Sequence, residues 1–171
     1  MQLIYIKNYI KIKLNIKKRD KIMNKRISSV LMAKYLIKQA KEKNVDLDMV
    51  KLQKLLYILD GGLLANDVNV IDENCRAWKY GPVYPKVFKS INPPDDFRKN
   101  YSKLDISEIN ENEHSEIIKL MVEIVLDNFG EYSSAQLSSW SHRKNSPWSK
   151  TKINKIISKE LIKNYFSYNN E

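Results

Sequence analysis

A run of leucines between residues 52 and 63 is the feature that most constrains the fold of this chain. The leucines stand at the three- and four-residue spacing that places them on one face of an α-helix: Leu52, Leu55, Leu56, Leu59 and Leu63. Asp48 precedes the run and is a good N-cap. Gly61 and Gly62 interrupt it, and each glycine costs up to about 1 kcal/mol relative to alanine. We therefore expect close backbone packing, or a break, at the two glycines.

Two more long helices are predicted from apolar spacing and from end signals. One begins at Ser28 or Ser29, where a serine can cap it, and ends near Asn44. The other covers residues 113–128 and has Gly130 as its C-terminal stop.

Shorter helices are expected elsewhere. They cover residues 134–141 and the segment from about Ser158 onward. Pro85 fits the first position of another helix, with Phe88 among its inward-facing residues. Residues 146–148 combine a serine N-cap, a first-turn proline and a large anchoring tryptophan, which is typical of a helix start.

The remaining segments have little regular pattern. Residues 66–80 are turn-rich, with one short extended piece around 76–78, and residues 92–112 are predicted to be a long polar loop with at most one irregular turn. The sequence therefore predicts a mainly α, compact single-domain fold with at most a small extended segment near residues 74–80.

Composition supports one self-sufficient domain. The chain has 171 residues, 43% of them hydrophobic, and at this size it can bury a core without a disulfide or a metal. Cys75 is the single cysteine, which excludes an intramolecular disulfide and suits a reducing cytoplasm, where we expect the protein to reside. No run of about 18 apolar residues is present, so no membrane association is expected.

The net charge of +10 is concentrated at the N-terminus. Residues 1–22 hold seven Lys or Arg and one Asp. We expect Met23 to be the native start, with residues 1–22 as a basic extension and residues 23–171 as the domain. The alternative is a basic arm that contacts nucleic acid.

Residues that could carry chemistry are few and scattered. The sequence lacks glycine-rich phosphate loops, and His114, His142 and Cys75 are too far apart to suggest a metal site. We expect no cofactor and no enzymatic activity. His142 follows Ser141 directly, which is not a nucleophile–base geometry, so a capping or buried hydrogen-bonding histidine is the simpler interpretation.

Three segments together resemble the Panacea domain. They are KLQKLLY at residues 51–57, AWKYGPV at 77–83, and Leu137 to His142 followed by SPW at 146–148. The chain departs from the family pattern at Gly62, where a Trp is usual, at Ser141, where a Thr is usual, and at Asp48, which often is Thr.

The resemblance singles out a set of family residues. Their role as scaffold or as a shared binding surface stays open: Leu52, Gln53, Lys54, Leu55, Leu56, Tyr57, Trp78, Tyr80, Gly81, Pro82, His142, Pro147 and Trp148. The polar ends of Gln53, Lys54 and Tyr57 are expected to reach the Gly81 turn or the His142 segment.

The same resemblance implies a function. Panacea proteins include SocA-like antitoxins and GepA-like phage-associated proteins, so we expect an antitoxin that binds a cognate toxin encoded nearby, in some cases as an adaptor for a protease. Candidate toxin contacts are residues 92–112 and the C-terminal residues Tyr165, Phe166 and Tyr168. The alternatives are a basic nucleic-acid-binding regulator of phage or mobile-element origin and an enzyme that uses His142.

Overall fold

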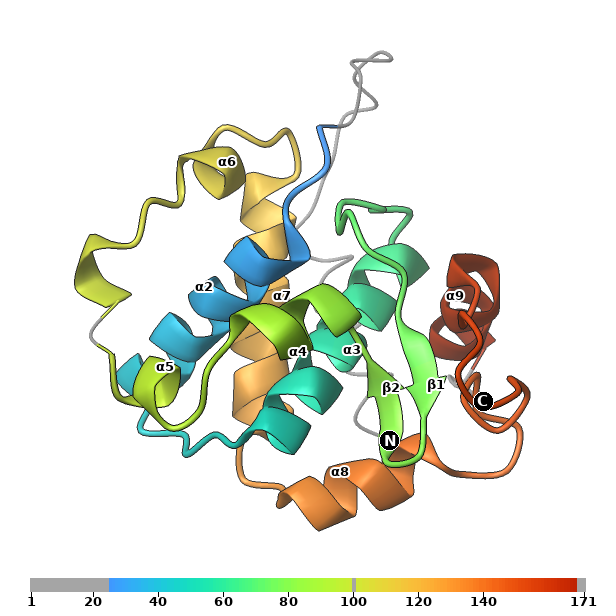
Figure 1. Ribbon diagram of the computed structural model, residues 1–171. Coiled ribbons are helices and arrows are strands. Elements are labelled where there is room, and N and C mark those ends of the chain that lie inside the picture. The colour runs from blue at the N-terminus through green and yellow to red at the C-terminus, as the bar shows by residue number, and fades with distance from the viewer. Residues whose placement is uncertain (1–24, 100, 169–171) are drawn as a thin grey trace.

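The computed structural model describes residues 25–99 and 101–168. The predicted basic extension and the proposed start at Met23 lie outside these residues. In the described part, helices surround one central helix, and the sheet has two short strands (Figure 1). The mainly α fold expected from the sequence is confirmed.

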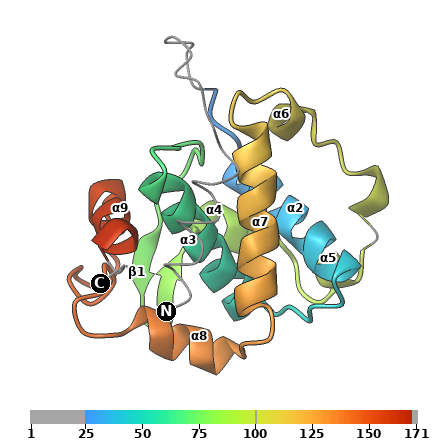
Figure 2. The ribbon, with the colours of Figure 1, turned by 180° about the vertical axis from the view of Figure 1, so that it is seen from behind.

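Helix α3, Met49–Ala65, is the central helix, with α7 on one side and α4 with the strands on the other (Figures 1 and 2). The N–H of Lys51 donates to the carboxylate of Asp48 at 2.9 Å, which confirms the predicted N-cap. Residues 51–64 are buried on every face, whereas the leucine spacing predicts a single buried stripe. Burial all round is typical of a helix that neighbours pack against from several sides.

The two glycines of α3 let other helices approach it closely. A β-carbon on Gly61 would lie 2.4 Å from the ring of Phe166 in α9, Lys159–Tyr168. A β-carbon on Gly62 would lie 2.6 Å from the sulfur of Met121 in α7, Ser115–Phe129. The close packing expected here is confirmed, and α3 continues through both glycines without a break.

Helix α2, Ser29–Glu42, begins where the sequence predicts, but its cap is different. Ser28 occupies the N-cap position and its side chain makes no capping hydrogen bond. The N–H of Ser29 instead donates to Oδ1 of Asp72 at 2.8 Å, and the Ser29 hydroxyl donates to Glu73 at 2.7 Å. A distant segment of the chain therefore caps this helix.

Strands β1, Arg76–Trp78, and β2, Gly81–Val83, form an antiparallel hairpin. The sequence predicts the first strand but not the second, because glycine and proline are depleted in strands. The outer edge of β1 bonds to the segment that leads into α9: the N–H of Ala77 donates to the carbonyl of Lys155 at 2.9 Å, and the N–H of Ile157 to that of Cys75 at 3.0 Å.

Helix α4, Pro85–Ser90, starts with proline at its first turn, as predicted. The expectation that Phe88 faces inward is wrong, because its side chain is 47% exposed. Its ring lies edge-on to that of Trp78, with centroids 5.2 Å apart. Within this six-residue helix only Val87 is buried.

Residues 92–112 contain more regular structure than a polar loop with at most one turn. The prediction for this segment is therefore wrong. They contain α5, Asp95–Arg98, a 3-10 turn η1, Tyr101–Lys103, and α6, Ser107–Asn110. Asp96 organises the first part, since its carboxylate accepts from the N–H of Asn92 at 2.6 Å and from the Tyr101 hydroxyl at 2.9 Å. The side chain of Asp96 is buried among these donors rather than solvated.

The C-terminal part follows the sequence expectation with one exception. Helix α8 covers Ser134–Ser141, as predicted, and Ser133 with Gln136 forms a capping box. Helix α9 begins one residue after Ser158. Residues 146–148 form turns and do not begin a helix, so that prediction is wrong.

Candidate functional site

The three sequence motifs meet where α3, the hairpin and the end of α8 are in contact (Figure 1). Polar side chains and one glycine make up this place, which we call the motif junction: Gln53, Lys54, Gly81, Ser141, His142 and Trp148. These residues lie up to 95 positions apart in the sequence, from Gln53 to Trp148.

Gln53 fixes the end of the hairpin to α3. The backbone N–H of Tyr84 donates to its Oε1 at 2.7 Å, and its Nε2 donates back to the Tyr84 carbonyl at 3.4 Å. This pair of bonds satisfies both backbone groups of Tyr84 in a buried place, where an unpaired polar group would be costly.

Lys54 lies under the hairpin turn. It is 1% exposed, and its Nζ donates to the Pro82 carbonyl at 3.1 Å. Gly81 has φ +109°, and a β-carbon there would lie 2.4 Å from Cε of Lys54 and 2.7 Å from Oγ of Ser141. The turn therefore requires glycine both for its backbone conformation and for the space that the lysine fills.

Burial lowers the pKa of Lys54 to about 8, although the nearby Cys75 and Asp48 act in the opposite direction. An ammonium group taken out of water loses its hydration, and one carbonyl bond restores only part of it. Such a lysine can act as a base near neutral pH. In this structure its Nζ is bonded to the Pro82 carbonyl and so supports the hairpin turn.

His142 is held by stacking. Its ring lies 3.7 Å from that of Trp148 at an interplanar angle of 20°. The indole Nε1 of Trp148 donates to the Trp78 carbonyl at 2.8 Å, which ties residues 146–148 to the hairpin. His142 occupies the C-cap position of α8, where its backbone N–H donates to the Ser138 carbonyl at 3.1 Å.

The surroundings of His142 disfavour the protonated form of its imidazole. Burial, followed by the charge of Lys54, lowers its pKa. Its Nε2 is buried and has no hydrogen-bond partner among the described residues. A neutral ring stacked on Trp148 suits these surroundings better than an imidazolium.

A second buried network, which the sequence interpretation missed, lies further along α3. The Tyr84 hydroxyl donates to Oδ2 of Asp60 at 2.7 Å, and Nζ of Lys159 lies 4.0 Å from Oδ1. Asp60 is fully buried, and burial raises its pKa, while Lys159 and the Tyr84 hydrogen bond lower it. The available signal was a lone carboxylate inside the most apolar helix of the chain.

The other family residues divide between core and surface. Tyr57 is buried, with its ring 5.6 Å from that of Phe166 and 6.5 Å from that of Trp140. Tyr80 at the hairpin tip is 63% exposed. The remaining ones are buried in the core or in the turns: Leu52, Leu55, Leu56, Pro82 and Pro147.

The C-terminal candidates for toxin contact have different surroundings. Phe166 is 3% exposed and packs on Gly61 and Tyr57. This burial corrects the expectation that Phe166 offers its ring to a partner. Tyr165 is half-buried beside Trp140. The side chain of Tyr168 lies outside the described residues.

Metal and membrane sites are not found in the part of the chain that the structure describes. There, no group of three or more His, Cys, Asp or Glu could hold a metal ion. Within residues 25–99 and 101–168, no helix combines the length and apolarity needed to cross a bilayer.

Known proteins that are similar to this chain belong to the family that its three motifs resemble. The model of the family described as "Antitoxin SocA-like, Panacea domain" matches residues 52–149. The chain is 31% identical over 124 residues to "Antitoxin SocA" of Caulobacter vibrioides (strain NA1000 / CB15N), which covers 68% of this chain and 66%, just under two thirds, of that protein. No solved structure matches the chain. The chain therefore belongs to the SocA-like antitoxin family with a Panacea domain.

Proposed function

We propose that this protein is an antitoxin that neutralises a cognate toxin protein by binding it directly. Family membership carries the proposal, since the matched relative is named an antitoxin. The environment of the motif residues supports binding over catalysis. The polar groups of Gln53 and Lys54 are hydrogen-bonded to backbone groups of the hairpin, so other surfaces are left to bind the toxin.

The test is co-expression of the full chain with each flanking open reading frame. We expect one of the two products to arrest growth alone, and the chain to restore growth and to co-purify with that product. Restored growth without any complex between the two purified proteins would contradict neutralisation by direct binding.

A matched pair of variants separates loss of fold from loss of contact. Phe166→Asp places a charge in the core next to Gly61 and is expected to abolish rescue by unfolding. Tyr165→Ser, next to it, tests the predicted toxin contact at a half-buried position. A folded Tyr165→Ser protein with unchanged toxin affinity would remove this residue from the interface.

Delivery of the toxin to a protease is the finer form of the proposal. It is decided by the half-life of the toxin in cells with and without the chain. A shortened half-life would support an adaptor role, and a stable toxin in a stable complex would support neutralisation by binding alone.

A further inference from the structure

The four large apolar side chains that the described chain leaves exposed all lie on two segments, residues 76–94 and 141–159. Their exposed fractions range from 47% to 63%: Tyr80, Phe88, Ile153 and Ile156. Isolated apolar residues on a surface need no explanation, but residues gathered in one place mark interaction sites.

The same two segments carry an unusual charge. They contain ten Lys or Arg and no Asp or Glu, whereas the rest of the described chain has 13 Lys or Arg and 18 Asp or Glu. A compositional preference for lysine would spread cations along the chain. The separation into a basic part and an acidic remainder therefore points to a local role.

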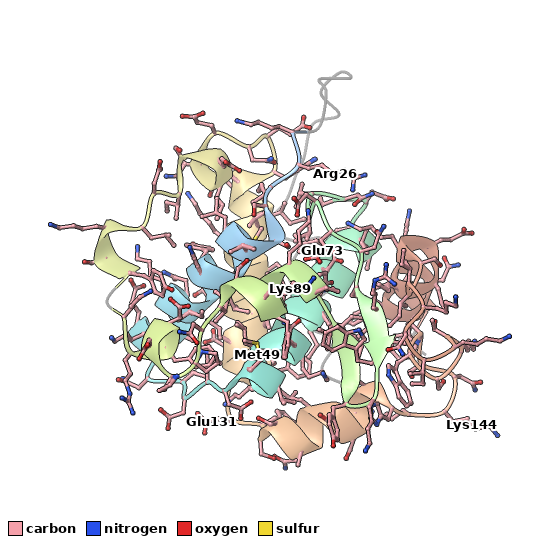
Figure 3. All side chains as sticks on the ribbon, in the orientation of Figure 1. Arg26, Met49, Glu73, Lys89, Glu131 and Lys144 are labelled. Carbon is pink, nitrogen blue, oxygen red and sulfur yellow. The ribbon has the colours of Figure 1, made fainter. Side chains whose placement is uncertain are left out.

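The fold joins the two segments into one surface, which we call the basic face. Figure 1 shows the hairpin, α4 and the segment that leads into α9 together, and Figure 3 labels Lys89 on α4 and Lys144 before that segment. Arg76 in β1 lies opposite Ile156, and its guanidinium donates to the Asn154 carbonyl at 3.1 Å.

The apolar residues lie among the cations on this face. Arg76 and Trp78 point to the same side of β1, since side chains alternate along a strand. Ile156 shares that side because it is paired with Arg76, and Phe88 packs on the Trp78 ring. Trp78 and Ile156 thus lie on the same side of the sheet as Arg76, and Phe88 extends this apolar part of the face through its contact with Trp78.

Most of these cations lack an acidic partner among the described residues. Lys86 pairs with Asp72 at 3.1 Å, and Lys159 lies beside Asp60. The others are exposed and make no ion pair with a described residue: Arg76, Lys79, Lys89, Arg143, Lys144, Lys150, Lys152 and Lys155. Complementary charge on a partner would steer its approach and fix its orientation.

We propose that the basic face binds an acidic protein surface that has an apolar centre of its own. The aliphatic side chains of Ile153 and Ile156 favour a protein over a nucleic acid, because bases stack on aromatic rings and not on aliphatic groups. Where the bound protein is the toxin, the inference rests on the proposed function.

Two variants of the full chain test the face, and one variant serves as the control. The charge variant is Lys150→Glu, Lys152→Glu and Lys155→Glu, and the apolar variant is Ile153→Ser with Ile156→Ser. The control reverses three exposed cations elsewhere, with the same change in net charge: Lys25→Glu, Arg98→Glu and Lys103→Glu. All these positions are exposed, so thermal melting is expected to show all three variants folded.

Two probes are used: the toxin recovered by co-expression, and peptides of about 15 residues in which Glu and Asp alternate with Leu and Phe. We expect both to bind the wild type and the control, more weakly as salt rises from about 50 to about 300 mM. Each face variant is expected to lose about tenfold or more in affinity. Wild-type affinity of both face variants for both probes, or no binding of either probe, would overturn the inference.

The outcomes distinguish this inference from the proposed function. If neither face variant weakens toxin binding, the antitoxin proposal stands and the proposed role of the basic face is overturned. Peptide binding through the face, with no toxin among the neighbouring products, supports the face and contradicts the proposed function. A third probe is single- or double-stranded DNA of about 20 nucleotides. If the chain binds this DNA more tightly than the peptides, and only the charge variant loses that binding, the inference of a protein partner is overturned.

Discussion

Replacement of Lys54 by Met tests whether the motif junction contains a buried ammonium group. Met keeps the length of the side chain and removes its charge. In the folded protein the pKa of Lys54 is about 8, against an ordinary value of 10.5. Below pH 8 the lysine is charged in both states, and the cost of burying that charge is fully present. As the pH rises from 8 to 10.5, the folded state gives up the proton first, so the wild type gains stability.

The size of this gain follows from the two pKa values. One pKa unit corresponds to about 1.36 kcal/mol, so between pH 7 and about pH 9.5 the wild type should gain about 2 kcal/mol relative to Lys54→Met. Tyr57, Tyr84 and Cys75 also have pKa values raised by burial, which lowers stability as pH rises. They are present in both proteins, so their contribution largely cancels in the difference.

Urea denaturation followed by circular dichroism measures the free energy of unfolding of both proteins at the two pH values. Lys89→Met is the matched control, because it makes the same chemical change at an exposed position on α4. A wild-type minus Lys54→Met difference that stays constant within about 0.5 kcal/mol between the two pH values would refute the buried, easily deprotonated lysine.

Three further changes test other parts of the structure by the same denaturation assay. Gly81→Ala should lower the free energy of unfolding by about 2–4 kcal/mol, since φ is +109° and the new methyl would meet Lys54; a loss below 1 kcal/mol would contradict this. Phe166→Ala should cost about 3–5 kcal/mol because the ring fills the space over Gly61, and a surface-like loss would return Phe166 to the list of partner contacts. The raised pKa of Asp60 stabilises the fold below pH 3.8, and this contribution is lost as pH rises through the folded pKa. The wild type should therefore lose stability relative to Asp60→Asn between pH 4 and 7, and the opposite trend would show that Lys159 dominates.

Local patterns predicted those parts of the fold that depend on neighbouring residues. The bounds of α8, the start of α9 and the Asp48 cap of α3 follow from signals within a few positions. The contacts of Gln53 and Lys54 with the hairpin agree with the prediction that polar side chains flanking the leucine stripe reach the Gly81 turn. The same prediction included Tyr57, whose ring packs against Phe166 and Trp140.

The wrong predictions concern side chains whose burial is set by residues far away in the sequence. The sequence predicts Phe88 inside, and it is exposed; it predicts Phe166 at a partner interface, and it is buried. The difference lies in what faces each ring: Gly61 leaves room for Phe166, whereas the ring of Phe88 lies edge-on to that of the half-buried Trp78. Apolar spacing along one helix carries no information about a glycine on another.

Polar residues were misjudged for the same reason. Asp96 lies in the segment that is predicted to be a polar loop, and its burial depends on Tyr101 and the Asn92 backbone. The Asp60 network depends on Tyr84, 24 positions away, and on Lys159 in α9. A single sequence shows that Asp60 is out of place in an apolar helix but not which residues pair with it.

The hairpin has consequences for how this protein can assemble with others. An exposed strand edge has unpaired backbone groups that can pair with a strand of another molecule, which leads to aggregation or domain swapping. Here β1 is covered by residues 154–157, and Gln53 and Lys54 occupy the groups at Pro82 and Tyr84 next to β2. Such a sheet cannot recruit a foreign strand. A change of binding specificity during evolution then needs only surface side chains to change, with no new backbone pairing.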